Sequence, residues 1–188
     1  MSFDLLQLNA AIAKHGPVHR VVIAAIKGSS PRELGASMLL WTGGQSGSIG
    51  GGALEYQASQ APKPGLRHYP LGPEIGQCCG GHVTLATEYF TQPVQAQDLY
   101  IRQIEGDLPL SLPLARMQKA QRNGLGVAAI AYSDGWLAEP IDRPLIPLWI
   151  WGAGHVGRAV VHIAAEMPNL NITWIDTSPE RFPENTPP

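Results

Sequence analysis

The chain has 188 residues, of which 44% are hydrophobic and 15% are charged, and its formal net charge is -2. This length suits one domain, or one domain with part of a second. The weakly acidic balance, without a local Lys/Arg cluster, argues against nucleic-acid binding because nothing would neutralise a phosphate backbone. No apolar stretch reaches the ~20 residues that a membrane-spanning helix needs, so no integral membrane segment is expected.

Two features bear on the cellular compartment. The first residues lack the basic and apolar regions of a secretory signal peptide. The chain has two cysteines, Cys78 and Cys79, and they are adjacent, which excludes an ordinary structural disulfide between them. We therefore expect a cytoplasmic, reducing environment.

Residues 1–143 alternate short apolar runs with turn residues, which predicts a mixed α/β domain. The patterns predict helices over residues 3–15 and 116–122, and a further helix that starts over residues 53–58 and is broken at residues 61–65. They predict strands over residues 18–26, 37–41, 82–90, 127–132 and 136–139, the last two joined by an Asp-Gly hairpin. Residues 46–52 contain too much glycine for a strand interior, residues 68–73 are expected to be an extended loop, and residues 92–114 are weakly patterned.

A second pattern starts after the proline-rich linker at residues 143–147, so we predict a second domain over residues 144–188. It consists of a strand over 148–151, a helix over 158–166 and a strand over 171–176. This order predicts the first βαβ unit of a Rossmann-like parallel sheet. Because such a sheet has five or six strands, the domain is apparently truncated, and its open edge predicts a homo-oligomer.

A glycine motif joins the first strand and the helix of this second domain. Gly152, Gly154 and Gly157 form a G-x-G-x-x-G pattern, and Asp176 follows 19 residues after Gly157 at the end of the next strand. With a strand before it and a helix after it, this is a dinucleotide-type fingerprint. It supports one hypothesis, an NAD(P)-binding oxidoreductase that uses these four residues as its cofactor site.

Three small-residue stretches, residues 27–38, 46–52 and 77–81, suggest a different site. Backbone N–H groups in such loops can approach an anionic ligand closely, and a helix that begins after glycines favours negative charge. An arginine in the first stretch can hold an oxyanion with two hydrogen bonds. The candidate binding residues are Ser29, Ser30, Arg32, Gly50, Gly51 and Gly52. No Gly-Lys-Ser/Thr follows, so a nucleoside-triphosphate P-loop is not supported.

Cys78 and Cys79 stand in the third stretch, before two glycines. Thiolates in a loop suit transition metals, sulfur transfer or a sulfur-rich metal cofactor. A vicinal disulfide is an alternative, although it would be strained. A zinc site with His82 is disfavoured, because adjacent cysteines seldom point at one metal and a fourth ligand is not evident. The chain lacks a G-x-S-x-G elbow, so we assign no catalytic residue.

These motifs resemble the N-terminal signature of the xanthine dehydrogenase accessory proteins, the XdhC/CoxI family. The resemblance is carried by Gly28-Ser29-Ser30-Pro31-Arg32 with Gly35-Ala36-Ser37-Met38, by Gly47-Ser48-Ile49-Gly50-Gly51-Gly52 with Glu55, and by Gln77-Cys78-Cys79-Gly80-Gly81. Gly152 to Gly157 and Asp176 are similar to the start of that family's C-terminal Rossmann domain. The sequence differs from the family pattern in stopping after the second Rossmann strand.

The resemblance implies a non-catalytic chaperone for the molybdenum cofactor. Such a protein holds molybdopterin, assists its sulfuration and delivers it to an apo molybdenum hydroxylase of the xanthine dehydrogenase type, with a cysteine desulfurase as a second partner. The small-residue stretches and Arg32 would hold the pterin phosphate, and Cys78 or Cys79 would approach the molybdenum. The alternatives are the NAD(P)-dependent oxidoreductase and a redox-active dithiol protein in which the two cysteines cycle.

Overall fold

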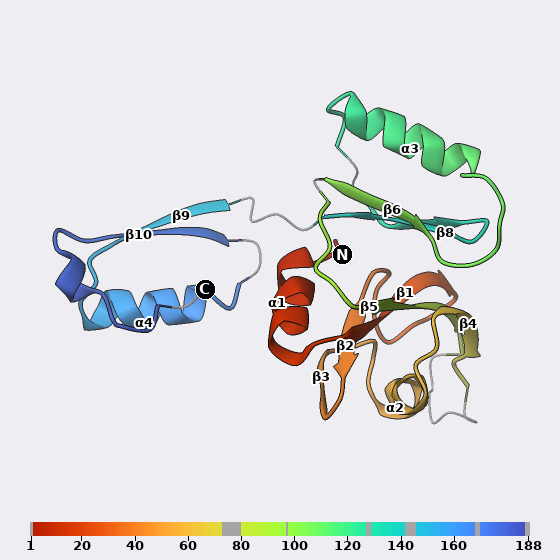
Figure 1. Cartoon of the computed structure of the whole chain (residues 1–188), viewed down its shortest axis with the longest axis horizontal. Coiled ribbons are helices and arrows are strands. Elements are labelled where there is room, and N and C mark those ends of the chain that lie inside the picture. The colour runs from red at the N-terminus through yellow and green to blue at the C-terminus, as the bar shows by residue number, and fades with distance from the viewer. Residues whose placement is uncertain are drawn as a thin grey trace. The chain divides into compact units, whose positions relative to one another are not determined.

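A computed structural model describes residues 2–72, 80–96, 98–126, 129–141, 146–167 and 170–186. It divides into two compact units, Met1–Ile141 and Asp142–Pro188, and each is described by itself (Figure 1). The first unit contains two antiparallel sheets with helices, and the second contains a parallel strand pair with a helix. The mixed α/β fold class is therefore confirmed.

The first unit is built on a five-stranded sheet with the order β3-β2-β1-β5-β4. These strands are β1 (Val18–Lys27), β2 (Ser37–Trp41), β3 (Gly44–Gly47), β4 (Gly65–Pro70) and β5 (His82–Phe90). The long central strands β1 and β5 pair antiparallel, with a bulge between Ile23 and Ala25. Their apolar side chains alternate between the two faces, so both faces of the sheet must be covered.

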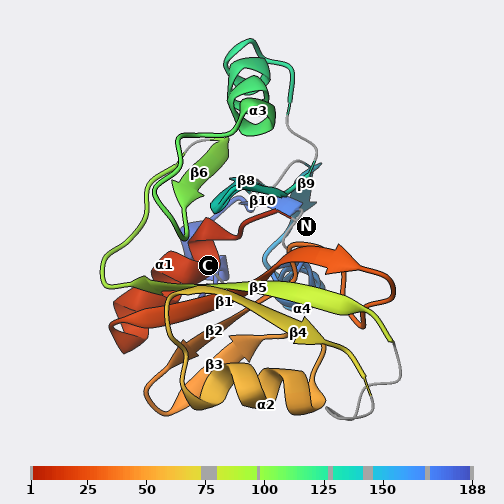
Figure 2. The ribbon, with the colours of Figure 1, turned by 90° about the vertical axis from the view of Figure 1, so that its right-hand side faces the viewer.

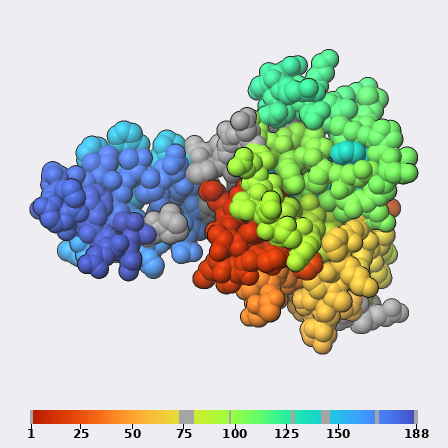
Figure 3. Space-filling view, in the orientation of Figure 1, coloured from red at the N-terminus to blue at the C-terminus, as the bar shows by residue number. Residues whose placement is uncertain are grey.

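Helix α2 (Gly52–Gln60) covers one face, where its Leu54 and Ala58 pack with Val21 and Ile23 of β1. The opposite face is covered by α1 (Leu5–His15) and by a second sheet, so the layers are helix, sheet, and helix with sheet (Figure 2). Helices α1 and α2 both keep a solvent-facing side, seen as the red and gold surfaces in Figure 3.

The second sheet has three strands in the order β6-β8-β7, and helix α3 contacts its strand β7. These elements are β6 (Leu99–Gln103), α3 (Leu112–Arg122), β7 (Ala131–Ser133) and β8 (Trp136–Pro140). The predicted Asp-Gly hairpin joins β7 to β8: Asp134 and Gly135 both have positive φ, 51° and 81°, as a two-residue turn between twisted strands requires.

Two expectations for loops in the first unit were wrong, and a strand lies in a stretch for which no element was predicted. Strand β3 extends into the glycine-rich residues 46–47, because an edge strand needs backbone pairing and β2 supplies it. Strand β4 takes up residues 68–70 of the expected extended loop at 68–73, since β5 offers its outer edge over residues 82–87. Strand β6 lies within the weakly patterned residues 92–114 and pairs with β8. In each case a partner strand outweighed local composition.

Four charged side chains, which we call the ion cluster, lie between the two sheets: Arg20, Glu88, Arg102 and Glu139. Arg20 binds Glu139 with two hydrogen bonds, of 2.8 and 2.7 Å, and its guanidinium carbon lies 3.9 Å from the Phe3 ring centroid. Arg102 bridges Glu88 and Glu139. The side chains of Arg20 and Glu139 are 2% and 1% exposed, so pairing must compensate for their desolvation.

The second unit is a βαβ arrangement of β9 (Ile146–Trp151), α4 (His155–Ala164) and β10 (Leu170–Ile175), followed by a short 3-10 turn (Pro179–Arg181). Strands β9 and β10 pair in parallel, as predicted for a strand–helix–strand unit. A Cβ on Gly157 would lie 1.8 Å from the Gly152 carbonyl oxygen, so the helix can pack this closely only on glycine. Among the described residues, no helix is long and apolar enough to cross a membrane.

Candidate functional site

The structure brings the three small-residue stretches together at one end of the five-stranded sheet. The first begins where β1 ends and the third ends where β5 begins. A Cβ added to Gly28 would lie 3.3 Å from the Gly81 Cα, and Ser29 forms an isolated parallel bridge with Gly80. The first and third stretches therefore lie side by side, although they are about 50 residues apart in the sequence.

The second stretch lies against the first. A Cβ added to Gly50 would come within 2.6 Å of Pro31 Cγ and 3.7 Å of Arg32 Cγ. Gly50 also has a φ of 126°, a region that other residues rarely adopt. Both steric space and backbone conformation therefore require glycine where the two stretches meet.

The predicted polar residues of the first stretch differ in their surroundings. Ser30 Oγ is buried and has no hydrogen-bond partner within the described part of the chain. Arg32 is one-third exposed and donates two hydrogen bonds of 3.1 Å to the Glu33 carboxylate. This hydrogen bonding raises the pKa of Arg32 and lowers the pKa of Glu33, so both groups are charged at neutral pH.

The amides of the second stretch already hold a carboxylate of the chain itself. Glu55 Oε1 accepts hydrogen bonds from the N–H groups of Ile49, Gly50 and Gly51, at 2.8, 3.2 and 2.7 Å, and from Ser48 Oγ at 2.5 Å. Gly51 caps helix α2, and Glu55 lies in the first helical turn, so the carboxylate occupies the position that sequence analysis gave to an external anion. A ligand anion could reach these amides only by displacing Glu55.

Burial raises the pKa of the Glu55 carboxyl, but the hydrogen bonds from Ser48 and the three amides outweigh it, so the net pKa is lowered. We expect Glu55→Ala to lower the free energy of unfolding by about 1–3 kcal/mol, because four donors lose their acceptor. Urea titration measures the change. The matched variant is Glu105→Ala, which removes an exposed carboxylate elsewhere in the first unit. An equal effect of both variants would contradict this role for Glu55.

Three basic residues lie beside the small-residue stretches and were not predicted from the sequence: Lys27, His68 and His82. Lys27 and His82 are directly opposed across β1 and β5, and both are exposed. His68 is opposed to Thr84, and its Nδ1 lies 2.9 Å from Thr84 Oγ1. Because His82 and Thr84 are two residues apart on β5, all three basic residues lie on one face of the sheet. Only strand register could have shown this grouping.

Cys78 and Cys79, the predicted thiol ligands, lie outside the described residues. Their segment joins the site at Gly80, which neighbours Ser29. Within the described ranges, no three His, Cys, Asp or Glu side chains are grouped closely enough to hold a metal ion.

Gly152 and Gly154 of the second unit's glycine motif lie in the turn between β9 and α4, and Gly157 lies in the first turn of α4. Gly152 has a φ of 100° and Gly154 caps α4. Asp176 accepts hydrogen bonds from the Ala153 amide, at 2.5 Å, and from the Thr177 amide, at 2.6 Å. These bonds lower the pKa of Asp176, the Ala153 amide contributing most. The acidic side chain therefore binds the glycine turn of its own unit.

Comparisons with known proteins agree with this arrangement. Residues 11–62 match the XdhC and CoxI family. A search of curated proteins gave no match. Among solved structures, the fold matches the crystal structure of a Bacillus halodurans protein described as a xanthine dehydrogenase, with a TM-score of 0.60 and 18% identity over 95% of this chain. The present chain spans 64% of that protein's length. The matched segment contains the first two small-residue stretches, so this part of the chain is similar to the XdhC and CoxI family, and the solved structure shows a shared fold.

Proposed function

We propose that this chain is an accessory protein that binds the molybdenum cofactor, protects it during sulfuration and delivers it to an apo molybdenum hydroxylase. The observation that carries the proposal is the convergence of the three small-residue stretches at one end of the sheet. The match of residues 11–62 to the XdhC and CoxI family supports it. The protein described as a xanthine dehydrogenase, which shares the fold, is consistent with a hydroxylase as the client.

The residues at this end of the sheet suit a ligand that carries a phosphate. Lys27 and Arg32 supply positive charge, His68 and His82 add ring nitrogens that can form hydrogen bonds, and the Ser30 hydroxyl is a buried donor without a partner among the described residues. Charge-assisted hydrogen bonds of this kind are the strong ones in phosphate recognition. In the proposal, Ser29, Ser30 and Arg32 hold the phosphate, and Gly50, Gly51 and Gly52 let the ligand approach the backbone once it displaces the Glu55 carboxylate from the Gly50 and Gly51 amides. Cys78 or Cys79 contacts the molybdenum of the cargo.

The proposal includes two protein partners and self-association. A cysteine desulfurase would supply sulfur to the bound cofactor. The second unit carries exposed apolar side chains on β9 and α4, among them Trp149, Trp151 and Ile163, which are 60%, 71% and 63% exposed. Contiguous exposed apolar groups are typical of interaction surfaces. We expect size-exclusion chromatography with light scattering to show a homo-oligomer, and a clean monomer would contradict that part of the proposal.

The test is retention of pterin. The purified chain is mixed with molybdenum cofactor, free ligand is removed, and retained pterin is measured by fluorescence after oxidation. We expect Arg32→Ala to lower retention at least about fivefold, because a charged phosphate contact is lost. We expect one of Cys78→Ala and Cys79→Ala to abolish retention. Arg116→Ala, which removes an exposed arginine from α3, is the matched control.

Two alternatives give different results in the same experiment. An NAD(P)-dependent oxidoreductase would retain no pterin but would bind NAD in a titration, and Gly154→Val would weaken that binding. A redox-active dithiol protein would show a change in thiol count between reduced and oxidised samples. Pterin retention that is unchanged in both cysteine variants and in Arg32→Ala would contradict the proposed site.

A further inference from the structure

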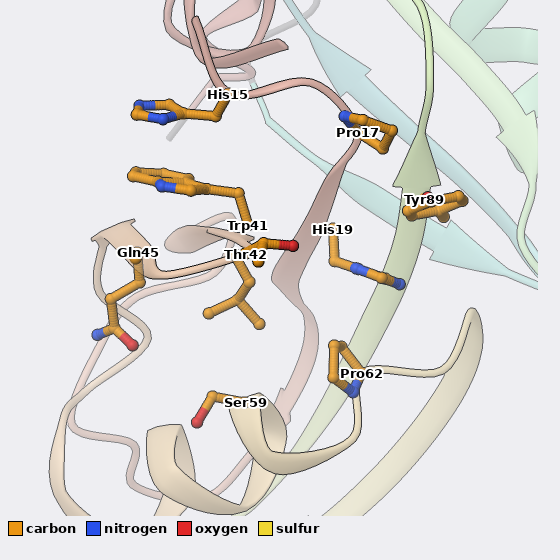
Figure 4. Close-up of a pocket in the computed structure, with 11 residues that line it drawn as sticks. His15, Pro17, His19, Trp41, Thr42, Gln45, Ser59, Pro62 and Tyr89 are labelled. Atoms are coloured by element: carbon orange, nitrogen blue, oxygen red, sulfur yellow. The ribbon is translucent and has the colours of Figure 1, made fainter.

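A pocket of about 560 Å³ lies on the α2 face of the five-stranded sheet, beyond the end of the helix (Figure 4). The pocket exists because helix α2 is much shorter than strand β1, which it partly covers. Helix α2 has nine residues and is about 13 Å long, whereas β1 has ten residues and is about 33 Å long. The helix therefore covers less than half of the strand, and the sheet face stays open where β1 begins. His19 lines this pocket near the start of β1, about 25 Å along the strand from the first small-residue stretch, whereas the lining residue Gln45 stands next to Ser46 of the second stretch.

Aromatic rings line the pocket. The His15 ring stacks on Trp41, with centroids 4.2 Å apart and an interplanar angle of 11°. His19 and Tyr89 are directly opposed across β1 and β5, and their centroids are 4.5 Å apart. Figure 4 shows the two ring pairs on different elements around the pocket. Rings placed in this way offer flat, polarisable surfaces to a ligand.

The polar groups around these rings carry no fixed charge. Gln45 and Ser59 line the pocket with an amide and a hydroxyl, and none of the described lining residues is Asp, Glu, Lys or Arg. Partial burial lowers the pKa of His19, so its imidazole is neutral at neutral pH and can both donate and accept a hydrogen bond. The lining therefore favours an uncharged ligand with hydrogen-bonding edges.

We propose that this pocket is a second binding site, which takes a planar, uncharged nitrogen heterocycle between the aromatic rings. Its volume lies within the range of small-molecule sites, about 300–1,000 Å³. A heterocycle would stack on a ring face and direct its edge to the amide and hydroxyl groups. None of the lining residues belongs to the small-residue stretches, although Gln45 adjoins the second, so this inference rests on the pocket lining and does not depend on the proposed function.

Adenosine is the probe, because its base is planar, uncharged and soluble, and ribose is the control without a ring system. The full chain, labelled with ¹⁵N, is titrated with each compound, and the indole N–H signal of Trp41 is identified by its loss in Trp41→Phe. We expect adenosine to shift this signal saturably, with a Kd of about 1 mM or lower, and ribose to leave it unchanged. We expect Tyr89→Ala to weaken binding at least about fivefold, because a stacking surface is lost.

Tyr56→Ala is the matched control, since Tyr56 is an exposed tyrosine on α2 that does not line the pocket. If Tyr89→Ala disturbs the fold, Gln45→Ala tests the polar edge from an exposed position and is expected to weaken binding too. The proposal is overturned if adenosine gives no saturable shift up to its solubility limit, or if ribose gives the same shift. Equal binding by the intact chain and by both pocket variants would overturn it as well.

Discussion

Glu139→Gln is expected to lower the free energy of unfolding by about 3–5 kcal/mol, the effect of breaking a buried ion pair. Glu139 is 1% exposed and receives two hydrogen bonds from Arg20 and one from Arg102. Neutralising it leaves the buried Arg20 with only Glu88, whose carboxylate lies 3.6 Å away. Because the ion cluster joins the two sheets of the first unit, we expect that unit to lose stability as a whole.

Urea unfolding followed by circular dichroism measures this change. The matched control is Glu33→Gln, which neutralises a carboxylate that is 50% exposed and also paired with an arginine. Exposed pairs contribute about 0–1 kcal/mol, so the control should be almost neutral. A double variant, Arg20→Met with Glu139→Met, should recover part of the lost stability, because it leaves no unpaired charge on either partner. Equal losses for Glu139→Gln and Glu33→Gln would contradict the argument.

The same cluster makes the first unit sensitive to acid. Burial raises the pKa of Glu139, but the charge and hydrogen bonds of Arg20, and then of Arg102, outweigh it, so the folded-state pKa lies below the ordinary 4.5. A carboxyl with a lowered pKa contributes stability above its unfolded pKa and loses it as the pH falls through the folded value. Stability should therefore decline below about pH 4.5. In Glu139→Gln this decline should be smaller.

Gly81→Ala is expected to separate the first and third small-residue stretches. A Cβ at this position would lie 2.0 Å from the Ser29 carbonyl oxygen and 2.8 Å from the Lys27 carbonyl oxygen. Both obstacles are backbone atoms, so no side-chain rotation relieves the clash. We expect a loss of about 1–3 kcal/mol of stability, as for overpacking in a core. On the proposed function, pterin retention should fall at least about tenfold, because the two halves of the site move apart.

The control for this variant is Gly72→Ala, at a described glycine where a Cβ would meet nothing within 4 Å. It should leave stability and pterin retention close to those of the unchanged chain. Thermal unfolding and the pterin assay are measured on both variants. If Gly81→Ala unfolds normally and retains pterin, the contact between Ser29 and Gly81 does not matter to the site. If Gly81→Ala and Gly72→Ala both lose pterin retention while staying folded, the loss does not depend on a steric clash, and the steric argument is wrong.

The elements that the sequence predicted well are those with strong local signals. Strands β2 and β5 have the expected bounds, because an apolar run lies between turn residues in each case. Helix α1 ends at the expected place, since Gly16 takes a φ of 79° and Pro17 follows. Helix α2 ends before the predicted break at residues 61–65, α3 is longer than predicted, and α4 begins three residues earlier than predicted. The residues at which a helix begins and ends depend on its caps and its packing, and these are difficult to predict from composition.

The sequence by itself determined the fold class, the glycine-rich stretches and the resemblance to the XdhC and CoxI family, because these rest on residue types and short spacings. Only the tertiary structure decided which groups meet. The partners in the ion cluster, such as Arg20 and Glu139, are up to 119 residues apart, and Lys27 faces His82 through strand register. The amides expected to bind an external anion hold Glu55 instead, because a helical turn returns that carboxylate to its own N-terminus. Pairing at a distance depends on how strands align and layers pack, and local patterns carry no record of that alignment.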